Sequence, residues 1–147
     1  MGYAQKVVFD FDGALQMARK LSRTSAAIAA LATTRRGLAD TALVDWVGAF
    51  GKDFDLRAST ELRNATDISN ALRFEADEWA LQWKNAMDQE NANRWARECD
   101  RIRDSRSNWS SAWGGVFGHD DLPGRPNEAD VPSAANNYLP TRSFVWY

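Results

Sequence analysis

The residues that could do chemistry are few and lie near the two ends of the chain. Near the start, Asp10 and Asp12 are separated by one residue, and near the end the single histidine, His119, is followed by Asp120 and Asp121. Carboxylates serve enzymes as nucleophiles, as acid–base groups and as ligands for divalent cations. The sequence therefore offers two candidate sites, and each depends on the elements that hold its carboxylates.

The first candidate site follows a short β-type run at residues 6–9. Residues 7–15, which read VVFDFDGAL, closely resemble the D-x-D-G-T-L opening of the haloacid-dehalogenase-like phosphatases, with Ala14 in the usual threonine or valine position. The resemblance implies that Asp10 attacks phosphorus and that Asp12 is the acid–base group, with Mg²⁺ bound. That fold needs several parallel strands, and no further β-branched apolar run appears before residue 143. We therefore prefer a simpler interpretation, in which Asp10 or Asp12 caps a first helix, and keep the phosphatase as a remote alternative.

The second candidate site lacks the partners that catalysis needs. His119 lies in a flexible-looking segment, so a Ser-His-Asp set would have to come entirely from the end of the chain. One histidine and one cysteine, Cys99, are too few for a zinc site built from such ligands, and residues 119–121 offer at most a weak site for a divalent cation. We predict that the protein is not an enzyme and has no catalytic residue, no metal site and no cofactor.

Composition limits the class of protein and of partner. The 147 residues, 44% of them hydrophobic, are enough for one domain with a buried core and a tail. A net charge of −2 gives no bulk attraction to nucleic acid or to an anionic membrane. No apolar run is long enough to cross a bilayer, and the N-terminus has no signal-peptide pattern. We expect a cytoplasmic protein that binds other proteins, with no nucleic-acid partner and no membrane insertion.

Two long stretches have helical periodicity. Apolar and small residues recur every three or four positions from Leu15 to Leu43, including Leu31 and Leu38, and predict a helix of about 30 residues that begins near Gly13. The second stretch begins at Lys52 or Asp53, and no proline interrupts it. Some 50 helical residues would form a rod of about 75 Å, so part of this helix needs another partner. The polar run at residues 89–93 is where we expect it to fray.

Trp46-Val47-Gly48 lies between the two predicted helices. Gly48 can take the positive φ of a sharp reversal, and the Trp46 indole can lie across the open end of two antiparallel helices. These features predict an all-α protein with a long antiparallel helical hairpin over residues 1–105 and its turn at residues 46–48. Residues 106–147, rich in Pro, Gly, Ser and aromatic residues, then form an extended C-terminal tail.

With helices on both sides and Phe54 after the glycine, this turn resembles that of the WXG100-like (ESAT-6-like) superfamily, in its actinobacterial branch. The resemblance covers about residues 8–103. It implies that two hairpins pair into a four-helix bundle and that a type VII secretion system exports the protein, as a substrate, adaptor or chaperone, without a classical signal peptide. The family's Tyr-x-x-x-Asp/Glu export signal is missing, since none of the three tyrosines has an acidic residue four positions later. A paired hairpin would then carry the signal for both chains.

The expected contacts are of three kinds. Trp46 and Gly48 form the turn. The residues expected to pack the hairpin and to bind a partner, either a second copy or another helical hairpin protein, are Leu62, Ile68, Leu72, Trp79 and Trp83. The tail docks through its aromatic residues Trp113, Phe117, Phe144, Trp146 and Tyr147. The sequence leaves open an alternative function, a structural subunit of a larger assembly whose copies are held together by this tail.

Overall fold

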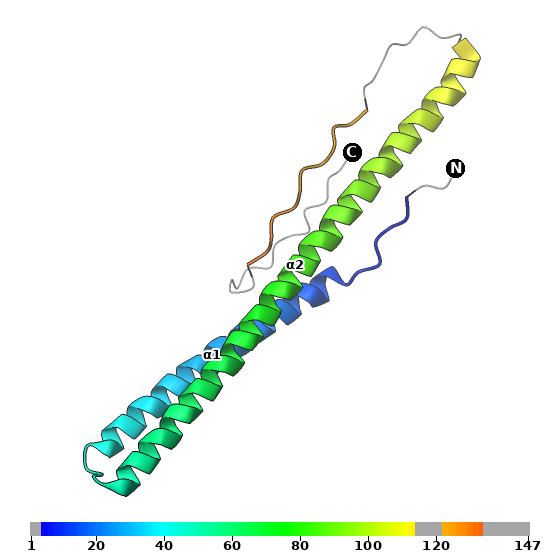
Figure 1. The fold of residues 1–147 in the computed structure, drawn as a ribbon. Coiled ribbons are helices and arrows are strands. Elements are labelled where there is room, and N and C mark those ends of the chain that lie inside the picture. The colour runs from blue at the N-terminus through cyan, green and yellow to red at the C-terminus, as the bar shows by residue number, and fades with distance from the viewer. Residues whose placement is uncertain (1–3, 114–121, 134–147) are drawn as a thin grey trace.

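The structure is a computed structural model that describes residues 4–113 and 122–133. It contains two antiparallel helices, α1 (Phe11–Leu43) and α2 (Ala49–Trp113), joined by a short turn (Figure 1). Across these described ranges there is no strand, so the β-type run at residues 6–9 leads into α1 without a sheet partner. The predicted all-α helical hairpin is confirmed.

Asp10 caps the first turn of α1. Its Oδ1 accepts a hydrogen bond of 2.9 Å from the Gly13 backbone N–H, and the helix begins at Phe11, slightly earlier than predicted. A Cβ atom at position 13 would collide with the Asp10 carboxylate, so the glycine leaves room for the cap. Helix initiation thus accounts for Asp10 and Gly13 of the Asp-x-Asp-Gly motif.

Gly48 reverses the chain between the helices. Its φ is +89°, a value that residues with a side chain rarely adopt. Its carbonyl accepts a hydrogen bond of 3.2 Å from the Lys52 backbone N–H, so α2 begins at Ala49 and not at Lys52 or Asp53 as predicted. Gly51 is buried in the first turn of α2, where a Cβ atom would collide with the Trp46 backbone carbonyl. Two glycines therefore fix the shape of this end of the hairpin.

The helices meet along a seam of mostly small residues that repeats every seven positions. A strict seven-residue repeat winds two helices around each other in a left-handed supercoil. Small side chains let the two backbones approach closely, and Ser25 Oγ lies 2.7 Å from the Ser69 carbonyl oxygen. The buried members of the repeat are Phe11, Ala18, Ser25, Ala32 and Ala39 on α1, and Ser69, Ala76 and Trp83 on α2. Glu90 continues the spacing on α2 and is buried against the residues that precede α1.

The buried face of α1 differs from the predicted stripe. Leu31 and Leu38 were expected to face the second helix, but they are 59% and 67% exposed. Their neighbours Ala32 and Ala39 take the seam positions instead, because a close approach of two helices favours small side chains over large ones. Two leucines are thereby left on the surface.

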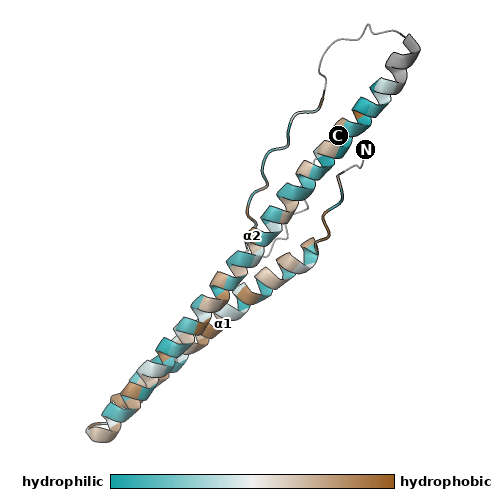
Figure 2. Cartoon of the chain, turned by 45° about the vertical axis from the view of Figure 1, so that its right-hand side comes forward, coloured by the Kyte–Doolittle hydropathy of each residue, from teal (hydrophilic) through white to brown (hydrophobic). Residues whose placement is uncertain are grey.

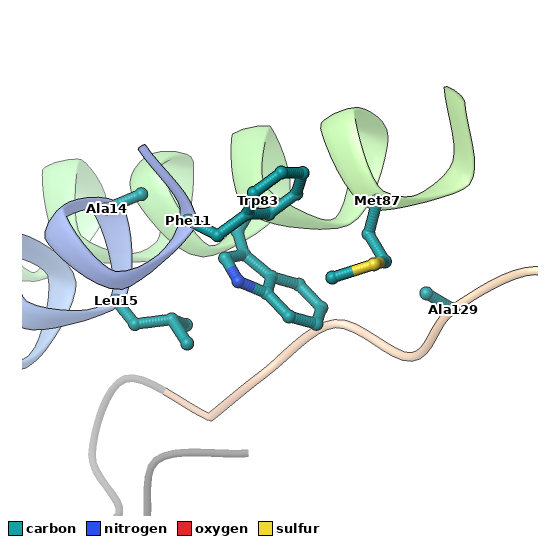
Figure 3. Packing of buried hydrophobic residues seen from close by; sticks show 6 residues of the cluster. All are labelled: Phe11, Ala14, Leu15, Trp83, Met87 and Ala129. Carbon is teal, nitrogen blue, oxygen red and sulfur yellow. The ribbon is translucent and has the colours of Figure 1, made fainter. Parts of the chain in front are cut away.

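Trp83 occupies the centre of the largest core cluster (Figure 3). Its ring packs edge-on against Phe11 with centroids 6.2 Å apart, and only 2% of the residue is exposed. Met87 lies one turn further along α2 and is fully buried. Ala14, Leu15 and Ala129 complete the cluster, so α1, α2 and a segment after α2 all contribute to it.

α2 is nearly twice as long as α1, with 65 residues against 33, or about 98 Å against about 50 Å. Beyond Trp83, two segments without regular secondary structure run beside it, residues 4–10 and residues 122–133 (Figure 1). We call residues 4–10 the N-terminal segment and residues 122–133 the strap. α2 is unbroken at residues 89–93, where fraying was expected, and it continues past residue 105, the predicted end of the hairpin, to Trp113.

Candidate functional site

The turn end of the hairpin carries a cluster of exposed apolar side chains, which we call the tip cluster: Val44, Trp46, Val47 and Phe50. Val47 is 87% exposed and Phe50 is 70% exposed. The Trp46 ring lies 5.4 Å from the Phe50 ring and 5.0 Å from the Phe54 ring, measured between centroids. Contacts between the rings hold Trp46 against the first turns of α2, and the rest of the tip cluster faces outward.

Beside the tip, the two helices leave a groove of about 370 Å³. Alanines and larger apolar side chains from both helices line it, together with two arginines and a glutamate. Figure 2 shows apolar positions on both helices near the turn. The Arg35–Glu61 ion pair, 2.7 Å between Nη1 and Oε1, joins the helices at its rim. The residues lining the groove are Ala32, Arg35, Leu38, Ala39, Phe54, Arg57, Ala58, Glu61 and Leu62.

The other edge of the same helix pair is closed by polar contacts. Arg36 on α1 donates to Asp55 Oδ1 and to Ser59 Oγ on α2, each at 2.8 Å, and pairs with Asp40 at 2.7 Å. Hydrogen bonding to Asp55, and then to Asp40, raises the pKa of the Arg36 guanidinium. Both edges of the hairpin near the turn therefore carry an ion pair between the helices, but they differ in what lies beside it. The Arg36 edge is closed by polar contacts, whereas the Arg35 edge opens into a groove lined by alanines, Leu38, Phe54 and Leu62 as well as by charged side chains.

The residues predicted to bind a partner lie in different environments. Leu62 lines the groove, Leu72 and Trp79 are half-buried, and Ile68 is 53% exposed. Trp83 lies in the core, so within this chain its role is packing. Among the predicted tail-docking residues, Trp113 ends α2 and its side chain is outside the description, as are Phe117, Phe144, Trp146 and Tyr147.

The N-terminal segment is held on α2 by side chains that contact its main chain. Glu90 Oε2 accepts from the Val7 N–H at 2.7 Å, Asn93 Nδ2 donates to the Gln5 carbonyl at 2.8 Å, and Arg97 Nη1 donates to the Ala4 carbonyl at 3.1 Å. Arg97 also pairs with the buried Glu90 at 2.8 Å. A rise of 1.5 Å per helical residue carries α2 about 10 Å from Glu90 to Arg97, which matches three residues of extended chain at about 3.3 Å each.

The strap binds the same half of α2 in a similar way. Trp95 Nε1 donates to the Pro123 carbonyl at 2.7 Å, and Asp88 Oδ1 accepts from the Ala129 N–H at 2.6 Å. Lys84 Nζ lies 2.6 Å from Asp88 and 3.2 Å from Glu128, and its hydrogen bond to Asp88 raises the pKa of the Lys84 amino group. Sequence reasoning missed the contacts of both segments; the polar run at residues 89–93 supplies two of the contacts to the N-terminal segment and none to the strap.

Comparison of the chain with models of protein families, with characterised proteins and with solved structures gives no match. Within the described part of the chain, no group of three or more His, Cys, Asp or Glu side chains is arranged to hold a metal ion. Residues 119–121, the second candidate site, lie outside that part. Neither α1 nor the described α2 has a stretch both apolar and long enough to span a bilayer.

Proposed function

We propose that the protein is a non-enzymatic protein-binding hairpin that pairs, through its groove, with a second copy or with a related hairpin to form a four-helix bundle. The observation that carries the proposal is the contrast between the two edges of the hairpin. One edge is closed by the polar contacts of Arg36, whereas the other, beside the exposed Arg35–Glu61 pair, opens into a groove lined largely by apolar side chains. Contiguous apolar surface of this kind marks sites where proteins associate.

Exposed apolar residues extend the groove along the same side of the hairpin. Leu31 lies seven residues before Leu38, which lines the groove, and positions seven apart share a face of a supercoiled helix. Ile68 lies seven residues after Glu61, another lining residue, by the same argument. The groove with Leu31 and Ile68, which we call the apolar face, suits a second helix pair better than a small ligand, because it is open and runs along both helices instead of enclosing a cavity.

A finer proposal concerns secretion. The Trp46-Val47-Gly48 turn resembles the WXG100-like superfamily, which implies a substrate or adaptor of a type VII system. The exposed tip cluster supports a further protein contact at the turn, separate from the apolar face. The alternative, a structural subunit of a larger assembly held together by its tail, rests on aromatic residues whose side chains lie outside the described part of the chain.

Light scattering coupled to size-exclusion chromatography tests the pairing. We expect the mass of two chains for the wild type and of one chain for Leu38→Glu and Ile68→Glu, which place a charge on the apolar face. Leu56→Glu is the matched control, because Leu56 is 66% exposed and lies about 200° around α2 from Phe54 in the groove. A wild-type mass of one chain would exclude self-pairing, and co-purification with a hairpin encoded nearby would then test pairing with a relative.

A further inference from the structure

The part of α2 beyond Trp83 recognises main-chain atoms of the strap. Asp88 accepts the Ala129 N–H and Trp95 donates to the Pro123 carbonyl. Any extended segment without proline at the Ala129 position offers the same two groups. The site therefore recognises the main chain of an extended segment and depends little on the side chains of that segment.

Two features of the strap add a limited preference. Lys84 lies 3.2 Å from Glu128, so a carboxylate is favoured at that position. Ala129 is the strap residue that packs against the cluster containing Met87 and Trp83 (Figure 3). Its side chain is a single methyl group, so a small apolar residue is favoured at this position. The favoured sequence is an acidic residue followed directly by a small apolar one.

Trp83 indicates that the strap is an incomplete ligand for this surface. Its Nε1–H is buried, and no acceptor for it is found among the described residues. The indole lies beside the strap and Met87 (Figure 3). A buried donor without an acceptor costs free energy, which a segment that supplied a carbonyl oxygen there would recover.

We propose that this surface of α2 binds an extended segment of a partner protein, with an acidic residue before a small apolar one, and that the strap occupies the surface until the partner displaces it. A tethered segment competes at an effective concentration in the millimolar range, so it can hold the surface through few contacts. The proposal does not depend on pairing through the apolar face, because that face lies near the turn and the strap lies beyond Trp83.

The test uses the full-length chain and a fluorescein-labelled peptide with the sequence of residues 122–133, LPGRPNEADVPS, followed by fluorescence anisotropy. Two variants loosen the tethered strap: Glu128→Lys places a cation beside Lys84, and Ala129→Pro removes the N–H that Asp88 accepts. We expect each to bind the peptide at least about tenfold more tightly than the wild type, because the competitor is weakened. Glu128 is highly exposed, so we expect Glu128→Lys to fold like the wild type. This variant therefore tests the proposal even if Ala129→Pro fails to fold.

Two controls separate this site from general peptide binding. Adding Asp88→Ala to Glu128→Lys removes the acceptor on α2 and should abolish the gain, whereas adding Asp77→Asn, an exposed position on α2 before Trp83, should preserve it. A peptide with proline at the Ala129 position should not bind. Equal peptide affinity of the wild type and both strap variants, or a gain that survives Asp88→Ala, overturns the proposal.

Discussion

Ser25 and Ser69 bond each other's backbone across the centre of the hairpin. Ser25 Oγ lies 2.7 Å from the Ser69 carbonyl oxygen, Ser69 Oγ lies 3.0 Å from the Ser25 carbonyl oxygen, and the two Oγ atoms are 2.9 Å apart. Each carbonyl belongs to a helix and accepts the hydroxyl with its second lone pair. The pair is buried, so it both satisfies two polar side chains and fixes how closely α1 and α2 approach.

Replacing Ser25 with a larger residue should destabilise the hairpin more than removing the Ser25 hydroxyl. Ser25→Ala should lower the free energy of unfolding by about 1 kcal/mol, because one hydroxyl is lost and Ser69 can still donate. Ser25→Leu should cost about 1–3 kcal/mol or more, because a larger side chain forces the helices apart. Urea unfolding followed by circular dichroism measures both, with exposed Thr24→Leu as the control that should stay within about 0.5 kcal/mol of the wild type. A fully tolerated Ser25→Leu would contradict the close approach.

Two glycines should respond in opposite directions to the same substitution. Gly48→Ala should destabilise the protein by about 1–2 kcal/mol, because the φ of +89° is unfavourable for any residue with a Cβ. Gly37→Ala should stabilise it by about 0.5–1 kcal/mol, because Gly37 lies inside α1 and a Cβ there meets nothing within 4 Å. Thermal unfolding of the two variants in parallel compares them. The same sign for both would be inconsistent with the turn geometry.

Two tryptophans should differ strongly in their contribution to stability. Trp83→Ala should cost about 3–5 kcal/mol, because it opens a cavity between Phe11 and Met87. Trp46→Ala should cost only about 0.5–1.5 kcal/mol, since its contacts are ring pairs at a partly exposed turn. Denaturant midpoints of the two variants provide the comparison. A variant that truncates Trp83 therefore reports on folding and is unsuitable as a probe of partner binding.

The Glu98–Arg101 pair should make stability depend on pH in the acid range. Its hydrogen bonds from Arg101 lower the pKa of the Glu98 carboxyl below its ordinary value. The stabilisation is therefore present above the unfolded-state pKa of about 4.3 and is lost as the pH falls through the lower, folded-state pKa. Glu98→Gln should flatten the stability profile in that window and leave the alkaline side unchanged. Titration of Glu98 by NMR at its ordinary pKa would contradict the prediction.

Loss of the Glu90 carboxylate should loosen the N-terminal segment from α2 but leave the packing of α1 against α2 unchanged. This carboxylate accepts the Val7 N–H, so the Val7 amide should exchange with deuterium more slowly than an exposed amide. Glu90→Gln weakens this charge-assisted bond and the Arg97 ion pair, and should accelerate exchange at Val7 by about tenfold. Amides around Ser25 should keep their protection, which serves as the internal control. Unchanged exchange at Val7 would show that the contact does not persist in solution.

Much of the fold could be predicted from periodicity, because a long helix with one buried side repeats apolar residues every three or four positions. The hairpin and its two long helices could be predicted from the spacing of apolar residues and the lack of proline. The seam could not, since a pattern of large apolar residues favoured Leu31 and Leu38, while close packing selected Ala32 and Ala39. Alanine and serine at seven-residue intervals were the signal, but small residues carry little weight in a hydrophobicity pattern.

The contacts of the distal part of α2 were harder to predict for a different reason. Asn91 and Asn93 disfavour a helix on their own, and fraying was expected at residues 89–93. In the structure Glu90 and Asn93 instead satisfy main-chain groups of the N-terminal segment, which lies more than 80 positions away in the sequence. Contacts between a side chain and a distant main chain leave no local pattern, so only the tertiary structure shows them.

Cys99, the single cysteine of the chain, is 3% exposed and lies three turns after Asp88, on the side of α2 that faces the strap. We expect the strap to shield this thiol, so that a thiol reagent reaches it only when the strap leaves that surface. If the strap closes faster than the reagent reacts, the observed rate divided by the rate for a free thiol gives the equilibrium constant of opening. The unlabelled, unsubstituted protein thus reports the population of its own open state through a single sulfur atom.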